Sequence, residues 1–382
     1  MEKHQKSGET ATKQKAPKAL KSIYEDGPTA AQYWEAGNSN DLPLLVLSQR
    51  NNYADTSLAF GGMLEMEPMN TWWGNTFHPG AGPGHVTGKN DYGHGVGIGL
   101  SAANIDVMAN LNKWIQAFVQ TQGTTQGVGL ESAFVNIGNL ADSPFYATAG
   151  LSRVRFGMFP GAPWAASITQ GIFRPGHVLN ATLGYSKGPI DAYLSYIPDD
   201  SSHKASMMAS AFYNGSFGDS GVTYTADAGY MNNMSVDGSA VANAMQTQDG
   251  GNAAAINADV SVGYEHANLS GGWIQTLNNL KVTNNAKAHT WWTQASYTAH
   301  AFARDFIFAV SYNQSQNTQQ VAMPLMGDIN HGPSLYGSKR GVLTYVDTQL
   351  FPNVNTGLEY AWLETYNDKD TNAVTLYTAF YF

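Results

Sequence analysis

The sequence predicts an all-β protein: a transmembrane antiparallel β-barrel of about sixteen strands, closed up-and-down. Three features of the 382-residue chain predict this fold. The chain ends on a strictly alternating strand, and its strand-like runs are joined by connections that alternate in length. No apolar run approaches the roughly eighteen residues that a spanning helix needs. We expect a polar, poorly ordered lead over residues 1–56 and an outer-membrane β-barrel over residues 57–382.

The last twelve residues, 371–382, carry the first of these signals. Successive side chains of a strand point to opposite sides. One face therefore carries Val374, Leu376, Thr378, Phe380 and Phe382, and the other carries Thr375, Tyr377, Ala379 and Tyr381. In a soluble sandwich, the alternative interpretation, this strand would leave an edge open to aggregation. A barrel in lipid removes that edge by pairing its last strand with its first. The ending also resembles the C-terminal signal of bacterial outer-membrane barrels, so Phe380 and Phe382 are our candidates for a membrane-assembly signal.

Strand-like runs and turns alternate along the rest of the chain. The sixteen predicted strands are 57–67, 95–108, 113–122, 130–137, 145–156, 178–186, 190–197, 206–217, 222–232, 254–266, 269–277, 289–300, 304–315, 340–351, 354–365 and 371–382. Connections after odd-numbered strands tend to be long, and those after even-numbered strands are short. Outer-membrane barrels sort their connections in this way, with short periplasmic turns and longer outer loops. A soluble sandwich has no reason to do so.

Composition narrows the class further. The formal net charge is −9 and only 13% of residues are charged, which argues against a nucleic-acid partner. The 40 Gly and 20 Tyr suit many turns and interfacial aromatic girdles. Cys is absent, which excludes disulfide frameworks and thiolate metal sites. Residues 1–22 are Lys-rich and hold no apolar segment, so we expect that a secretory signal is missing from this sequence.

The lead holds one short apolar run, 44–47, which we expect in the barrel mouth or at the periplasmic end. Residues 1–56 are too few for the folded plug of an energy-coupled siderophore transporter, which also needs a wider barrel. Any selectivity must then come from the lumen and the outer loops.

The fourth and fifth strands carry a more specific pattern. It consists of Ile-Gly-Asn-Leu at 137–140, Ser-Pro-Phe-Tyr at 143–146, Thr-Ala-Gly at 148–150 and Phe-Gly-Met-Phe at 156–159, with weaker support from Leu-Gly-Tyr at 183–185. The pattern resembles the siderophore-porin family typified by the legiobactin receptor. The resemblance implies an outer-membrane barrel that admits iron as a ferric siderophore or related chelate. We predict no cofactor. Two features depart from the family: its signal peptide and short coiled-coil lead are not visible, and Arg153 and Arg155 stand where less charged residues are expected. No family binding residue is carried over.

One group of candidate ligand-binding residues falls in the first long connection, predicted at 68–94. It holds Trp72, Trp73, His78, His85 and His94. Three imidazoles suit a transition metal, but their irregular spacing in a Gly/Pro-rich stretch favours ordinary loop histidines, and the metal is left unknown. Folded over the mouth, the same loop would instead gate or recognise an aromatic, anionic ferric chelate.

A second group consists of Arg153 and Arg155, on one face of the fifth strand, and Arg174 in the next loop. A cationic cluster in a pore attracts anionic solutes such as carboxylate siderophores. Alternatively, these arginines lie at the outer rim and contact lipopolysaccharide phosphates.

No sequence motif indicates catalysis: there is no nucleophile elbow and no His-Glu-x-x-His. We therefore predict no enzyme and no catalytic residues, but an outer-membrane channel for iron. Its partners would be a ferric siderophore or iron chelate, outer-membrane lipid and lipopolysaccharide, and the barrel-assembly machinery. The alternatives are a general diffusion porin and a sealed structural or adhesive surface barrel.

Overall fold

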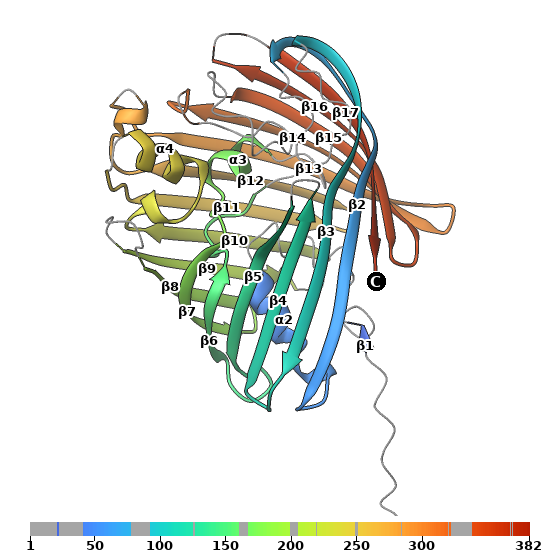
Figure 1. Ribbon diagram of the computed structural model, residues 1–382, viewed down its shortest axis with the longest axis vertical. Helices are drawn as coiled ribbons and strands as arrows, with labels where there is room; N and C mark the ends of the chain where they lie inside the picture. The colour runs from blue at the N-terminus through green and yellow to red at the C-terminus, as the bar shows by residue number, and fades with distance from the viewer. Residues whose placement is uncertain are drawn as a thin grey trace, which may run out of the picture.

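The structure is a computed structural model that describes residues 21–22, 41–77, 92–124, 127–159, 167–198, 205–218, 220–248, 251–283, 285–319, 321, 338–366, 368 and 370–382. Sixteen strands, β2 to β17, form a closed antiparallel barrel (Figure 1). Each strand pairs with the next along the chain, and β17 pairs with β2 to close the barrel. A two-residue strand, β1 (Lys21–Ser22), pairs in parallel with Ala59 and Phe60 of β2. The predicted fold class is confirmed.

The barrel strands have the following bounds: β2 (Ser57–Phe77), β3 (Tyr92–Asn110), β4 (Ile115–Thr124), β5 (Gly127–Gly138), β6 (Phe145–Ser152), β7 (Val178–Lys187), β8 (Ile190–Ile197), β9 (Ser206–Ser216), β10 (Val222–Met231), β11 (Ala255–Tyr264), β12 (Ala267–Thr276), β13 (His289–Ala301), β14 (Arg304–Gln316), β15 (Ser338–Phe351), β16 (Val354–Thr365) and β17 (Asp370–Tyr381). Each of them overlaps one strand predicted from the sequence. The largest differences lie at the C-terminal ends of β2 and β6.

The first two predicted strands are too short. β2 continues to Phe77 and β3 begins at Tyr92, so Trp72, Trp73 and His94 lie on strands and not in a loop. The first strand was predicted to end before Pro68 because proline has no backbone N–H to donate to a neighbouring strand. Here Pro68 lies in a β-bulge, where proline is tolerated: the register with β3 jumps from Glu67–Gly99 to Asn70–Gly97.

The fifth predicted strand is too long. β6 ends at Ser152, and the chain leaves the wall there, so Arg153 and Arg155 do not share a strand face as predicted. They begin the connection 153–177, which carries the short helix α3 (Ile168–Phe173). This helix packs against β13, β14 and β15. The connection therefore crosses the lumen from β6 to a distant part of the wall (Figure 1).

Connection lengths differ at the two ends of the barrel. At one end the connections 188–189, 265–266, 302–303 and 352–353 have two residues each. At the other end the connections 153–177, 232–254 and 317–337 are long, although 125–126 and 366–369 at this end are short. We call the first the short-turn end.

The closing strand β17 has an apolar outer face and an inner face that lines the lumen. On β17, Thr375, Tyr377, Ala379 and Tyr381 are buried and face the lumen, whereas Phe380 and Phe382 are 40% and 62% exposed on the outer face. Large apolar side chains are exposed in the same way on β2 to β5, where they would meet hydrocarbon. Among the described residues, no helix has the length and apolar character needed to span a membrane.

Short helices occupy part of the interior. Besides α3, these are α2 (Leu42–Ser48), η1 (Arg50–Asn52), η2 (Met234–Val236), α4 (Ala240–Gln248) and η3 (Lys281–Thr283). An apolar cluster joins α3 and α4 to inward-facing wall residues such as Leu343 and Leu363. A second, smaller cluster packs α2 onto β2 to β5. The described part of the lumen is thus partly filled by chain segments and is not a plain cylinder.

Candidate functional site

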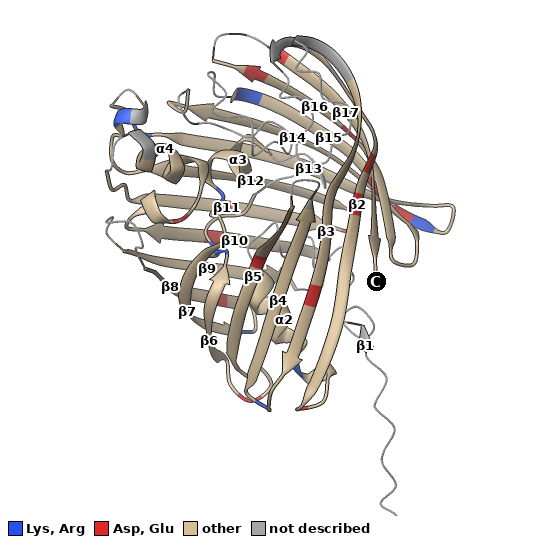
Figure 2. Ribbon diagram, in the orientation of Figure 1, with Lys and Arg blue, Asp and Glu red and all other residues tan. Residues whose placement is uncertain are grey.

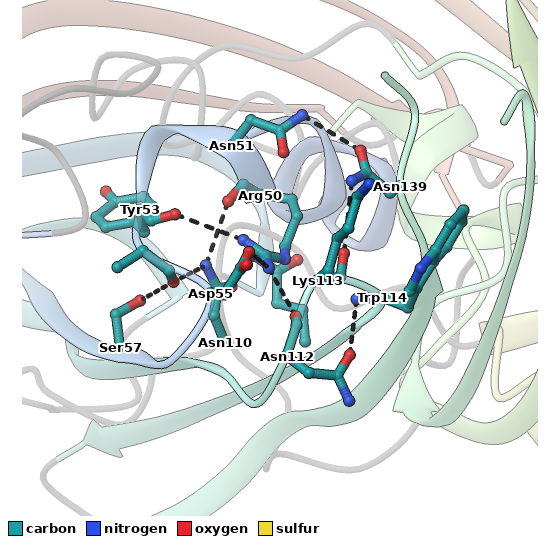
Figure 3. A network of polar contacts seen from close by, with 12 residues as sticks. Arg50, Asn51, Tyr53, Asp55, Ser57, Asn110, Asn112, Lys113, Trp114 and Asn139 are labelled. Carbon is teal, nitrogen blue, oxygen red and sulfur yellow. Dashed lines mark hydrogen bonds and ion pairs between the residues drawn. The ribbon is translucent and has the colours of Figure 1, made fainter. Parts of the chain in front are cut away.

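The chain that precedes β2 is fixed at the short-turn end by a polar network (Figure 3). The Arg50 side chain is almost fully buried and donates at 2.6 Å both to Asp55 and to the carbonyl of Asn112 in the β3–β4 turn. Asn110 donates in turn to the carbonyls of Arg50 and Ala54, each at 3.2 Å. A buried guanidinium needs such partners, so these contacts hold residues 50–55 against the barrel end.

From this anchor α2 lies along the inner wall. Leu42, Val46 and Tyr53 pack with Met108 and the stacked rings of Phe118 and Phe134. Asn136 of β5 donates to the carbonyl of Pro43 at 2.9 Å. A proline is tolerated in the first turn of a helix because its missing N–H would be unpaired there. Residues 41–56 of the expected lead are therefore folded, and the apolar run 44–47 belongs to a helix inside the barrel.

Asp41 connects α2 to the connection 153–177. Its Oδ1 lies 2.5 Å from Nε of Arg155, in contact but without hydrogen-bond alignment. Arg155 also donates to the Tyr193 hydroxyl, lies 3.9 Å from a carboxylate oxygen of Asp191, and stacks 3.4 Å from the ring centroid of Phe212. These contacts hold the guanidinium between α2 and the wall formed by β8 and β9.

Burial and charge compete in this ion pair. Burial raises the pKa of Asp41 to about 6, although Arg155 opposes the shift. Burial alone would lower the pKa of Arg155, but Asp41, Tyr193 and Asp191 outweigh it and raise the pKa above its ordinary value. The guanidinium therefore stays charged, and Asp41 is the group of the pair that titrates near neutral pH.

A second cluster surrounds Arg153. Its Nε donates to Nε2 of His177 at 3.1 Å, and its Nη1 donates to the carbonyl of Pro175 at 2.7 Å. The opposite ring nitrogen of His177, Nδ1, lies 3.1 Å from Glu131, which is also 3.8 Å from Arg153. Glu131 is the extra residue of a bulge in β5, because Gln120 and Thr121 pair with Ser132 and Leu130. Bulges re-aim side chains in this way.

The protonation of this cluster follows from its contacts. Burial, then Arg153 and Arg174, lowers the pKa of His177 to about 2, so the imidazole is neutral. It accepts from Arg153 at Nε2, so its proton is on Nδ1, the nitrogen that lies 3.1 Å from Glu131. Burial lowers the pKa of Arg153 to about 10, against the attraction of Glu131. Arg174, which directly follows α3, has its pKa lowered by burial and then by Arg153, while Glu131 opposes the shift.

Carboxylates gather on another part of the inner wall. They are Glu65 and Glu67 of β2, Asp106 of β3, Asp347 of β15 and Glu359 of β16. Figure 2 shows acidic residues along β2, β3 and β5. The described lumen therefore carries arginines near β6 to β8 and α3, and an acidic wall from β15 through β17 to β3.

The structure brings together only some of the predicted site residues. Arg153 and Arg155 line one narrow cavity beside α2, together with Asp41 and Tyr193. Their side chains are 17% and 11% exposed and lie inside the barrel, not on its outer rim. Arg174 acts on Arg153 and His177 from the far end of the same connection.

The predicted aromatic and histidine group is dispersed. Trp73 is exposed on β2, with its ring 6.5 Å from that of Tyr360, and its backbone pairs with that of His94. Trp72 pairs through its backbone with Gly95. His78 and His85 lie outside the described residues. In the part of the chain that the structure describes, no group of three or more His, Cys, Asp or Glu is placed to hold a metal ion.

Sequence reasoning missed the partners of the arginines: Asp41, Glu131, His177, Asp191 and Tyr193. A weak signal existed for Glu131 and Asp191, since each is a lone acid within a predicted strand of a chain that has few charges. Asp41 gave no signal, because its contact with Arg155 joins segments far apart in sequence.

The architecture defines the class: a porin-like, closed sixteen-stranded barrel with an inward-folded connection. The outer membrane channel DcaP of Acinetobacter baumannii matches it with a TM-score of 0.55 at 9% identity, over 86% of this chain and 97% of that one. The anion-selective porin from Comamonas acidovorans matches with a TM-score of 0.53 at 12% identity, over 86% of this chain and 100% of that one. At these identities the likeness is one of fold.

The sequence comparisons give the family. Residues 38–258 match the family described as "Protein of unknown function (DUF3573)", and the chain belongs to it. Two UPF0422 proteins of Legionella pneumophila, from the Paris and Lens strains, are 24% and 23% identical over 262 residues. The match covers 59% of this chain and 49% of each relative, so the chain spans about half the length of these curated relatives.

Proposed function

We propose that the protein is an outer-membrane porin for small anionic solutes, and that ferric siderophores or related carboxylate-bearing iron chelates are among them. The observation that carries the proposal is the place of the three arginines. Arg153, Arg155 and Arg174 all belong to the connection that crosses the lumen of a closed barrel. Guanidinium groups bind carboxylates bidentately, and a cationic lumen raises the local concentration of anions.

The two arginine clusters have different roles in this proposal. Arg155 is held by Asp41 and Asp191, so it fixes α2 and the wall and is a poor binder of further anions. Arg153 and Arg174 repel each other and both lie in the field of Glu131. An anion that entered beside them would relieve this repulsion. We therefore assign solute attraction to Arg153 and Arg174, and positioning to Arg155.

Two further observations support the proposal by analogy. The matched structures include an anion-selective porin and an outer membrane channel. The iron chelate, as the particular solute, rests on the resemblance of residues 131–159 to the siderophore-porin family.

Planar-bilayer recording tests the anion preference. The protein is refolded, and its reversal potential is measured in a KCl gradient. We expect anion selectivity, and Arg153→Gln should move the reversal potential toward that of a cation-preferring pore. Arg304→Gln, which removes the same charge beside Phe351, is the matched control and should leave it unchanged. A pore that prefers cations in the wild type would contradict the proposal.

Uptake of radiolabelled ferric iron tests the solute. Cells with and without the gene are compared, in the presence and absence of their native siderophore. A loss of uptake only with siderophore supports siderophore transport, and a loss in both conditions indicates a simpler iron species. Unchanged uptake in both conditions leaves a general diffusion porin.

A sealed structural or adhesive barrel is the second candidate, favoured by the apolar packing of α3 and α4 against inward-facing wall residues. Liposome swelling separates it from a porin, because a sealed barrel passes no small sugars.

A further inference from the structure

The acidic wall contains buried oxygen atoms that lack a donor. Thr375 of β17 is 1% exposed, faces the lumen and has no hydrogen-bond partner for its Oγ1. Asn70 of β2, also 1% exposed, has no partner for its Oδ1, while its Nδ2 donates to Glu67 at 3.4 Å. Buried polar atoms are nearly always paired, so two unpaired acceptors side by side call for a donor.

The strand register places these two atoms among carboxylates. Thr375 is the direct cross-strand neighbour of Asn70 on one side and of Glu359 on the other. The Pro68 bulge lets Glu65, Glu67 and Asn70 all face the lumen, because strict alternation from Glu67 would have turned Asn70 outward. Five oxygen-bearing side chains on β2, β16 and β17 are therefore buried on the same stretch of the lumen wall: Glu65, Glu67, Asn70, Glu359 and Thr375.

Glu65 adds the charge requirement. It is 3% exposed, and the charged groups that act on it are carboxylates. Its charged neighbours are Glu67 and Glu359. A buried carboxylate beside two others is costly unless a cation or proton compensates it.

We propose that this part of the lumen binds an organic cation with N–H donors, in its simplest form a primary ammonium group. An ammonium has three donors and no acceptor, which matches a set of acceptors spread over three strands. A metal ion would instead require a compact ligand group, and the described residues offer none of three or more His, Cys, Asp or Glu. The site is formed by β16, β17 and β2, whereas Arg153 and Arg155 contact β5, β8 and β9, so it does not depend on the anion path.

Saturation-transfer NMR on the refolded full chain tests the site. The probe is methylammonium, and tetramethylammonium, which has the same charge but no N–H donors, is the control probe. We expect saturation transfer to methylammonium and roughly tenfold weaker binding in Thr375→Val and in Glu65→Gln, the scale of one lost charge-assisted hydrogen bond. Thr378→Val, the same substitution on the outer face of β17, should bind as the wild type does.

Three outcomes would overturn the proposal. Equal transfer to both probes would mean charge attraction without hydrogen bonding. Displacement of methylammonium by a lower concentration of Ca²⁺ would identify a metal site. Wild-type binding in a folded Thr375→Val variant, with folding checked by circular dichroism, would mean that the Thr375 hydroxyl does not bind the ammonium group.

Discussion

Single side chains in this lumen are governed by burial as much as by charge. Asp41 forms an ion pair with Arg155, and in water such a pair lowers the pKa of the carboxyl. Inside the barrel, burial raises the pKa of Asp41 to about 6 instead. His177 shows the same effect, since burial and two arginines keep it neutral although Glu131 is adjacent. The functional charges of the lumen are therefore set by packing.

The Asp41 pKa gives a prediction for stability against pH. A carboxyl whose folded pKa lies above its ordinary 3.8 binds more protons when folded, so its contribution to stability is present below about pH 4 and lost as the pH rises to about 6. We expect Asp41→Asn to remove this part of the pH dependence of the unfolding free energy, up to about 3 kcal/mol by linkage. Guanidinium unfolding of the refolded protein at pH 4, 5, 6 and 7 measures it.

Asp237 provides the comparison for that experiment. Burial raises its pKa to about 7, so its own stability loss extends to a higher pH. Asp237→Asn should remove the part of the decline that continues to about pH 7 and leave the smaller decline, complete by about pH 6, that Asp41 causes. The unfolding free energy of the wild type minus that of Asp41→Asn should fall between pH 4 and 6. A rise in this difference would contradict the raised pKa of Asp41.

At the scale of elements, the sequence predicts what depends on local periodicity and misses what depends on contacts inside the lumen. Alternation along residues 371–382 gave β17 and its two faces, because lipid and lumen select opposite side chains at every step. The bulge at Pro68 was missed, since a proline that ends a strand and one that bends it look alike in sequence. The end of β6 at Ser152 was missed because the partners that draw Arg155 inward, such as Asp41, lie far away in the chain.

The candidate site divides in the same way. Arg153, Arg155 and Arg174 could be selected from the sequence because cations are scarce in this chain. The sequence could not predict which arginine positions α2 and which attract solute, because these roles depend on the carboxylate that each arginine contacts in the fold. The acidic wall was invisible for a related reason: Glu65 and Glu359 become neighbours only when the last strands close onto the first.

The helix α2 is an insert in the lumen and not part of its wall, which makes it separable from the barrel. Val46 is fully buried in the cluster with Met108, Phe118 and Phe134. Val46→Asp would bury an unpaired carboxylate at a cost of several kcal/mol, so we expect α2 to leave the wall while the barrel stays folded. If the lumen conducts, single-channel conductance and the rate of liposome swelling should both rise.

Ser48→Asp, which adds the same charge at an exposed position of α2, is the control and should behave like the wild type. Unchanged conductance in Val46→Asp, with α2 shown to be released by proteolysis, would mean that α2 does not restrict the lumen.

For the whole molecule, closure of the barrel depends on the seam between β17 and β2. Phe382 pairs with Gly62 by two backbone hydrogen bonds, of 3.0 and 3.1 Å, and its ring lies directly over the Gly62 Cα, where a Cβ would clash with it. Gly62 thus makes room for the last aromatic side chain. The seam is formed by residues at opposite ends of the barrel sequence, so it forms only after the intervening strands are in place.

This seam allows the structural role of Phe382 to be separated from its expected role as an assembly signal. Phe382→Ala keeps the backbone pairing and removes only the ring, so we expect refolding into lipid vesicles with a stability loss of about 1–3 kcal/mol. If the barrel-assembly machinery also reads this residue, the amount of folded protein in the outer membrane of cells should fall far more than the in vitro loss explains. Phe302→Ala, which removes an exposed ring from the β13–β14 turn, should affect neither measurement. A cellular loss no larger than the vesicle result would assign Phe382 to closure of the seam alone.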